Sequence, residues 1–185
     1  KSLAYGPFIE SLYSAASRSE NYLSLFTSTQ IKKDLHVEAF LRILAMSDIY
    51  YGKFKSSKQG IKNILDEYGE QKKSEIISEE VISKLFSSLD QLLEFFEAKK
   101  LFRRVNANRD IEGILNFGIL ESLLGVMVFG GYKLPDKFNE KYINYMGQLF
   151  DGYLLDESHN PFSTSTGSVL SIKKRFEIFE GMLEK

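Results

Sequence analysis

The sequence predicts an all-α fold, a single-domain bundle of about six to eight helices around a central apolar helix at residues 111–129. That segment is apolar on nearly every side, and a helix without a polar face belongs in the centre of a bundle. Other segments repeat apolar residues at helical spacing, whereas we find no alternating strand and no internal repeat. We therefore expect one helical domain over residues 1–185.

The composition limits the classes of function. A hydrophobic content of 43% in 185 residues is enough for one core. The net charge of −1 excludes a uniformly basic nucleic-acid binder, although a local basic patch is compatible with it. Without cysteine there is no disulfide framework and no thiolate metal site, which suits a cytoplasmic protein. Because the chain starts at Lys1 without methionine, we expect a fragment of a longer protein.

Capping residues and glycines mark the expected helices in order. The first helix starts at Pro7, and residues 17–30 predict a short helix followed by a loop. The other expected helix starts are Asp34, Ser78, Asp110 and Pro135. The expected helix ends are Gly52, Gly69 and Gly130-Gly131. Residues 151–168 have turn chemistry, and a last helix carries Ile172, Phe176, Phe179 and Leu183 on one face.

The central helix carries a stripe of small residues. Gly118, Ser122 and Gly125 fall at i, i+4 and i+7, so we expect a neighbouring helix to approach closely along this line. The longest apolar run, 114–129, is interrupted by Asn116 and Glu121 and is too short to span a bilayer. We therefore expect no membrane partner.

A cluster of cations precedes the central helix. We name this set the basic cluster, and it comprises Lys99, Lys100, Arg103, Arg104 and Arg109, interleaved with Asn106 and Asn108. These residues are candidates for nucleic-acid binding, because cations neutralise phosphates and asparagine amides bond to backbone or bases. The alternative is structural: the arginines pair with Glu94, Glu97, Asp110 or Glu112 and fix the loop between two core helices. The sequence favours the structural reading slightly.

A hydroxyl-rich run, residues 163–168, precedes the last helix. Hydroxyls and free N–H groups at a helix start bind anions, which makes candidates of Ser165, Thr166, Lys173, Lys174 and Arg175. More often such a run caps its own helix, and we favour that reading.

No catalytic motif is present. His36 and His159 are far apart in sequence, so we predict no metal site, and no phosphate-binding glycine loop or other cofactor motif occurs. Asp90, Glu97 and Lys99 only faintly match the Asp…Glu-x-Lys pattern of metal-dependent nucleases, because they lie on or beside a predicted helix.

The order of several segments resembles the helical region of the domain-of-unknown-function-262 family, which includes the ParB-like, GmrSD-type restriction proteins. YGPFIESL resembles the segment after the catalytic domain of the family. Asp34, Glu38, Leu41, Arg42 and Ala45 match its D-x-E-x-x-L-R-x-x-A helix. Phe102-Arg103 and the following helix resemble its F-R element, and Arg175-Phe176 stands for its closing Arg-Ile. The resemblance covers nearly all 185 residues.

The resemblance implies a helical module of a restriction or phage-defence protein. The D-G-Q-Q-R motif of the N-terminal domain is absent, since Asp151-Gly152 is followed by Tyr153, and so is the histidine-rich nuclease domain. No catalytic residue is therefore carried over, and any nuclease or NTPase activity belongs to other parts of the parent protein. The implied partners are an upstream catalytic domain or a partner protein, and weakly bound DNA. The sequence indicates no oligomeric state.

Three functions stay open. The first is the non-catalytic defence module with a DNA contact through the basic cluster. The second is a helical protein-interaction domain without a nucleic-acid role. The third is a hydrolase, which needs a cleft where Asp90, Glu94 and Glu97 converge with raised pKa values.

Overall fold

The structure is a computed structural model that describes residues 6–150, 160–163 and 166–185. Nine helices lie within these residues: α1 (Pro7–Ala16), α2 (Glu20–Leu23), α3 (Ser28–Lys32), α4 (Leu35–Tyr50), α5 (Ile61–Lys72), α6 (Glu79–Leu93), α7 (Phe117–Gly130), α8 (Phe138–Phe150) and α9 (Val169–Met182). Two short strands, β1 (Arg104–Val105) and β2 (Ile111–Glu112), pair antiparallel. The predicted all-α class is confirmed, with one small hairpin added.

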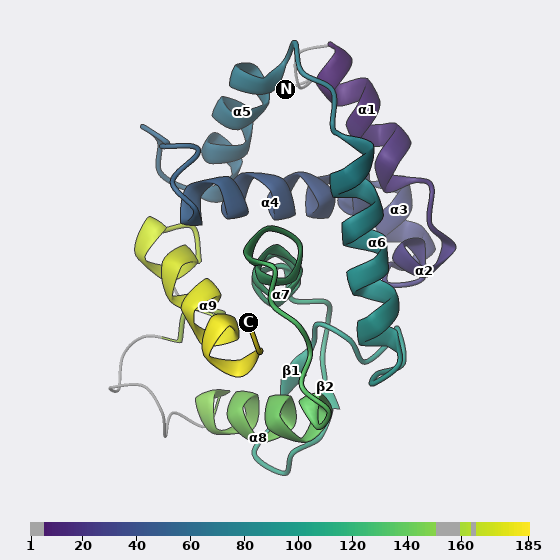
Figure 1. The fold of residues 1–185 in the computed structure, drawn as a ribbon, viewed down its shortest axis with the longest axis vertical. Helices are drawn as coiled ribbons and strands as arrows, with labels where there is room; N and C mark the ends of the chain where they lie inside the picture. Colours follow the sequence, from purple (N-terminus) through teal and green to yellow (C-terminus); the bar gives the residue numbers. More distant parts are fainter. Residues whose placement is uncertain (1–5, 151–159, 164–165) are drawn as a thin grey trace.

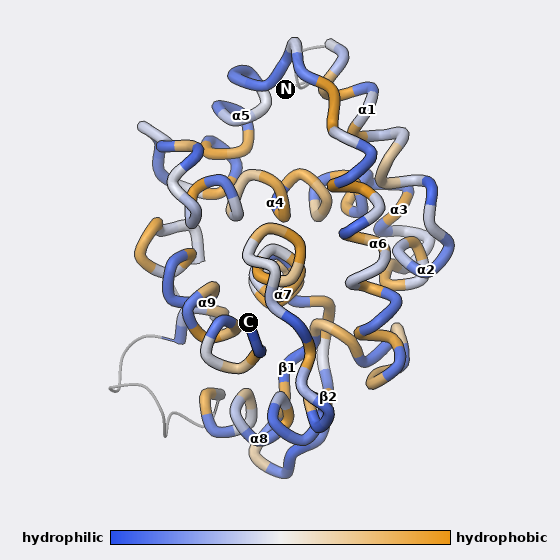
Figure 2. Tube along the Cα trace, in the orientation of Figure 1, coloured by the Kyte–Doolittle hydropathy of each residue, from blue (hydrophilic) through white to orange (hydrophobic). Residues whose placement is uncertain are grey.

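Helix α7 is the centre of the bundle. It packs against α4, α6 and α9, and Figure 1 shows it nearly end-on with these helices around it. Every residue from Gly118 to Val128 is buried. Figure 2 shows hydrophobic residues along α4 and α7 and hydrophilic ones on the outer sides of the surrounding helices. The predicted central apolar helix is therefore confirmed.

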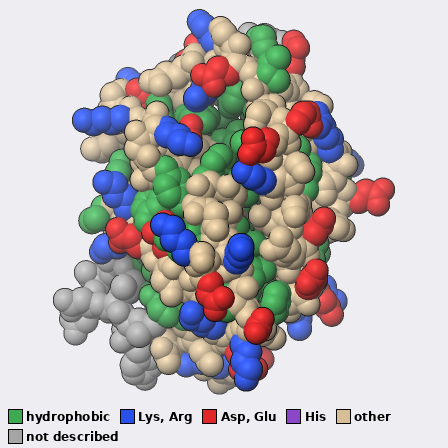
Figure 3. Space-filling model, viewed as in Figure 1, with side chains coloured by type: hydrophobic (Ala, Val, Ile, Leu, Met, Phe, Trp, Pro, Cys, Tyr) green, Lys and Arg blue, Asp and Glu red, His purple; other side chains and the backbone are tan. Residues whose placement is uncertain are grey.

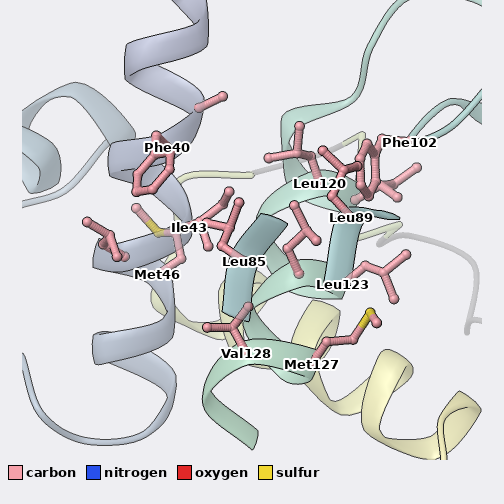
Figure 4. Packing of buried hydrophobic residues seen from close by; sticks show 14 of the residues in the cluster. Phe40, Ile43, Met46, Leu85, Leu89, Phe102, Leu120, Leu123, Met127 and Val128 are labelled. Carbon is pink, nitrogen blue, oxygen red and sulfur yellow. The ribbon is translucent and has the colours of Figure 1, made fainter. Parts of the chain in front are cut away.

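The core around α7 is built from side chains of several helices. Figure 4 shows Phe40, Ile43 and Met46 of α4 on one side, with Leu85 of α6 and Leu123 of α7 beside them. All five side chains are fully buried. At full burial each such side chain contributes about 1.5–3 kcal/mol relative to an exposed one, so this packing is a major source of stability.

Two glycines of the predicted stripe lie where neighbouring helices approach α7. A Cβ atom on Gly125 would stand 2.5 Å from Ser47 Oγ of α4 and 2.6 Å from Phe176 Cε1 of α9. A Cβ atom on Gly118 would stand 3.0 Å from Arg175 Cδ. The close approach expected from the sequence is confirmed, because these distances leave no room for a side chain.

The start predicted for the central helix is wrong. Asp110 does not cap α7; the cap is Asn116, whose Oδ1 accepts a hydrogen bond from Ile119 N at 3.1 Å. Residues 104–112 form the hairpin instead. Its turn is closed by Asn106, whose backbone N–H donates to Asp110 O at 2.9 Å and whose Oδ1 accepts from Asp110 N at 3.0 Å. The predicted end is confirmed, because Gly131 takes the left-handed conformation with φ 71°.

Three smaller features differ from the sequence prediction. Residues 17–30 contribute to two short helices, α2 and α3, because Ser19 and Thr27 each provide an N-cap. Helix α5 continues past Gly69 to Lys72. Asp34 is the N-cap residue of α4, as predicted, but its side chain makes no capping hydrogen bond; its Oδ2 accepts from the Tyr13 hydroxyl at 3.0 Å. By contrast, Ser78 caps α6 as predicted, accepting from Val81 N.

Candidate functional site

Arg103 of the basic cluster serves the local structure. Its Nη1 donates to Leu101 O at 2.9 Å and to Ala98 O at 3.3 Å, and burial lowers the pKa of its guanidinium. Its own carbonyl accepts from the Tyr142 hydroxyl of α8 at 3.0 Å. Arg103 therefore holds the segment between α6 and β1 in place. Its partners are carbonyl oxygens, whereas the sequence suggested carboxylates.

Asn106 and Arg109 belong to the hairpin turn. Beyond its bonds to Asp110, Asn106 donates from Nδ2 to Glu112 Oε2 at 3.1 Å. Arg109 has a positive φ of 67° and lies directly against Gly147 of α8. Both side chains shape the hairpin and its contact with α8, so they are poorly placed to reach a separate ligand.

Four members of the predicted nucleic-acid set face solvent: Lys99, Lys100, Arg104 and Asn108. Lys99 Nζ lies 3.3 Å from Glu97 Oε2 in an exposed pair, which contributes little to stability. The structure thus separates these four exposed members from three half-buried ones, Arg103, Asn106 and Arg109. On the face shown in Figure 3, basic and acidic side chains are interspersed, without a continuous basic surface.

The described members of the predicted anion-binding set do not form one site. Ser165 lies outside the described residues, and Lys173 is exposed beside half-buried Lys174. Of the described candidates, Thr166 lines a hollow of about 650 Å³ between the 58–60 segment and the start of α9. Ser168 caps α9 by accepting from Ser171 N at 3.1 Å. The run therefore caps its own helix through Ser168.

Arg175 corrects the sequence interpretation most strongly, because its side chain is fully buried. Its Nη2 donates to Glu121 Oε1 at 2.5 Å, and its Nη1 donates to Pro161 O at 2.9 Å and Thr166 O at 3.0 Å. Among the described residues its Nε has no hydrogen-bond partner. Arg175 thus ties α9 to α7 and to the chain that leads into α9, and it cannot act as a surface anion ligand.

Glu121 also accepts a hydrogen bond from a second arginine, Arg42. This buried group of three charged residues was not predicted from the sequence. Arg42 Nε donates to Glu121 Oε2 at 2.7 Å, and the Arg42 guanidinium lies 5.1 Å from the centre of the Phe117 ring. We call Arg42, Glu121 and Arg175 the buried triad. It joins α4, α7 and α9. The signal in the sequence was the single carboxylate inside an otherwise apolar helix, since such a charge needs a buried partner.

The carboxylates considered for catalysis do not converge. Asp90 Oδ1 accepts from Asn21 Nδ2 of α2 at 2.8 Å, and Glu94 and Glu97 are exposed. Within the described ranges, no three histidine, aspartate or glutamate side chains lie close enough to hold a metal ion. The hydrolase hypothesis therefore has no supporting geometry in the part of the chain that the structure describes.

The two histidines differ in placement. His159 lies outside the described residues. His36 is only 5% exposed and packs edge-on against Phe26, and its Nδ1 has no hydrogen-bond partner within the described part of the chain. Burial lowers the pKa of His36, partly offset by the nearby Asp34 carboxylate. His36 is thus a core side chain in an aromatic environment.

The comparisons with known proteins give no relative: no family model, no curated protein and no solved structure matches the chain. A search of the described residues for membrane spans finds no helix with the length and apolar character to cross a bilayer. Three charged residues of the segments quoted for the family resemblance, Glu38, Arg42 and Arg175, lie in or beside the buried triad.

Proposed function

We propose that this chain is a non-catalytic helical module of a restriction or phage-defence protein of the ParB-like, GmrSD type. In this role it supports or regulates a nuclease or nucleotide-binding domain and makes a weak contact with DNA. One observation carries the non-catalytic part. Two arginines of the segments that resemble the family, Arg42 and Arg175, both donate to Glu121, which is 0% exposed, so their role is to fix the arrangement of α4, α7 and α9.

The DNA contact is proposed for the four exposed members of the basic cluster. Lys99, Lys100 and Arg104 flank or begin the hairpin, and Asn108 lies in its turn. Solvent-facing cations of this kind neutralise phosphates, and a nearby amide adds a hydrogen-bond donor. The net charge of −1 provides little long-range attraction, so the expected affinity is low and strongly dependent on salt.

The test is the affinity for a fluorescently labelled DNA duplex, measured by anisotropy over a series of salt concentrations. About three phosphate contacts predict a log–log slope of roughly −2.7. The double variant Lys100→Ala, Arg104→Ala should flatten the slope by nearly two units. The matched control removes two exposed lysines of the 52–60 connector, Lys55→Ala and Lys58→Ala, and should leave the slope unchanged.

The variant Arg103→Ala distinguishes a role in DNA binding from a role in the stability of the fold. Because Arg103 donates to two carbonyl oxygens, Arg103→Ala should lower the melting temperature and leave the salt slope of DNA binding unchanged. A slope that is the same in the wild type and the Lys100, Arg104 double variant would remove the hairpin from the DNA-binding account.

A helical protein-interaction domain without a nucleic-acid role is the second candidate. The contacts of Arg103, Asn106 and Arg109 favour it, because these side chains bond to or pack against other parts of this chain in the loop and the hairpin. Absence of DNA binding at low salt would leave this second candidate in place of the first.

A further inference from the structure

A groove separate from the basic cluster lies between α4 and α5. Its volume is about 500 Å³, within the range of small-molecule sites. Val37, Leu41 and Leu65 lie beneath its surface and are at most 6% exposed, so its accessible apolar lining comes from half-buried Ile61 of α5 and from Tyr13 of α1. The groove therefore offers apolar surface to a ligand of modest size.

One residue of the buried triad, Arg42, lines the same groove. The triad holds two guanidinium groups against one carboxylate, so its three side chains carry one excess positive charge. The Arg42 side chain is 11% exposed, which leaves a small part of it accessible from the groove. A charge this deep is screened far less than one on the open surface.

Glu38 is the residue that balances this excess charge at present. Its Oε1 lies 3.7 Å from Arg42 Nη1, and its side chain is 42% exposed. At that distance and exposure the pair is a loose one, worth little. Lys33 and Lys62 on the lining are matched in number by Asp34 and Asp66, so the rim adds little net charge.

We infer that the groove between α4 and α5 binds a small amphipathic anion. The apolar body of the ligand packs against Ile61 and the ring of Tyr13. Its carboxylate, sulfonate or phosphate group approaches the Arg42 guanidinium and takes the place of Glu38 as the counter-charge. This site is independent of the proposed DNA contact, because it lies on α4 and α5 and shares no residue with the basic cluster.

The experiment is a titration of the 185-residue chain with anilinonaphthalene sulfonate, an aromatic sulfonate whose fluorescence rises in apolar surroundings. Saturable enhancement, displaced by octanoate and much less by the uncharged octanol, is the expected result. Glu38→Gln removes the competing carboxylate and should tighten binding roughly two- to fivefold, the range of a partly exposed charge pair.

Two variants place a negative charge in the groove. Ile61→Glu adds a carboxylate at the first residue of α5, where the helix dipole favours it, and should abolish binding. Lys62→Glu, at an exposed position on the same lining, is the second variant if Ile61→Glu lowers the melting temperature markedly. Glu70→Gln makes the same charge change as Glu38→Gln on exposed α5 surface outside the groove and should leave the affinity unchanged.

Four results would overturn the inference. The first is no saturable binding to the wild-type chain. The second is binding that persists in Ile61→Glu and Lys62→Glu. The third is an affinity that does not change in Glu38→Gln. The fourth is equal displacement by octanol and octanoate, which would show an apolar patch without an anion subsite.

Discussion

The buried triad can be tested by the substitution Glu121→Gln. Glu121 is 0% exposed and accepts from both guanidinium groups, Arg42 at 2.7 Å and Arg175 at 2.5 Å. Glutamine keeps the size and one acceptor oxygen, but it removes the negative charge and turns an N–H donor toward one of the arginines. The buried Arg175 guanidinium then lacks a counter-charge, and Arg42 keeps only its loose pair with Glu38, so the variant should be clearly less stable.

The magnitude follows from the burial of the group. Removing one partner of a buried ion pair typically costs about 3–5 kcal/mol, because the remaining charge stays in the interior. A domain of this size loses about 2–4 °C in melting temperature for each kcal/mol. Glu121→Gln should therefore melt roughly 6–20 °C below the wild type.

The measurement is thermal and urea unfolding followed by circular dichroism. Glu80→Gln is the matched control, because it makes the same chemical change in an exposed pair in which Lys84 Nζ lies 2.7 Å from Glu80 Oε1. That control should stay within about 0.5 kcal/mol of the wild type. If Glu121→Gln melts as the control does, the triad does not hold the core together and the reasoning fails.

Three further predictions concern the packing, the helix start and the buried histidine. Gly125→Ala should lower the free energy of unfolding by about 1–3 kcal/mol, because the added methyl group stands 2.5 Å from a hydroxyl of α4. Gly181→Ala, whose methyl group meets no described atom within 4 Å, should raise the free energy measured by thermal unfolding by about 0.5–1 kcal/mol. Asn116→Ala should lose about 1–2 kcal/mol as the cap of α7, and Asp110→Ala should change the unfolding free energy by less than about 0.5 kcal/mol. Burial lowers the pKa of His36 in the folded chain, so the unfolded chain binds the proton first and stability falls as the pH drops below about 6.5. In urea unfolding, His36→Gln should lose less stability than the wild type between about pH 7 and pH 5.

The sequence determined the class of fold and the position of its centre. The run 114–129 has no polar face, and burying it within a bundle is the only arrangement that shields it from water on all sides. Local chemistry also located the cap at Ser78, the end at Gly131 and the close approach at Gly125. The cap and the helix end depend on residues within a few positions of each other, and the stripe of small residues depends on spacing within one helix, so the pattern alone predicts them.

The start of α7 needed the tertiary structure. Asp110 and Asn116 are both good caps when taken alone, and only the hairpin decides between them. The hairpin depends on the bonds of Asn106 to Asp110 and on the contact of β1 with α8. Whether Arg103 faces a ligand or its own loop was open for the same reason, because the choice depends on carbonyl oxygens that folding brings within reach.

The buried triad was decided by the tertiary structure alone. Glu121 was visible in the sequence as a break in an apolar run, but its partners lie 79 and 54 residues away. An arginine on α4 or α9 looks the same in the sequence whether it meets solvent, an anion or a buried carboxylate. Periodicity fixes which face of a helix is buried, whereas the pairing of charges across three helices exists only once those helices have packed together.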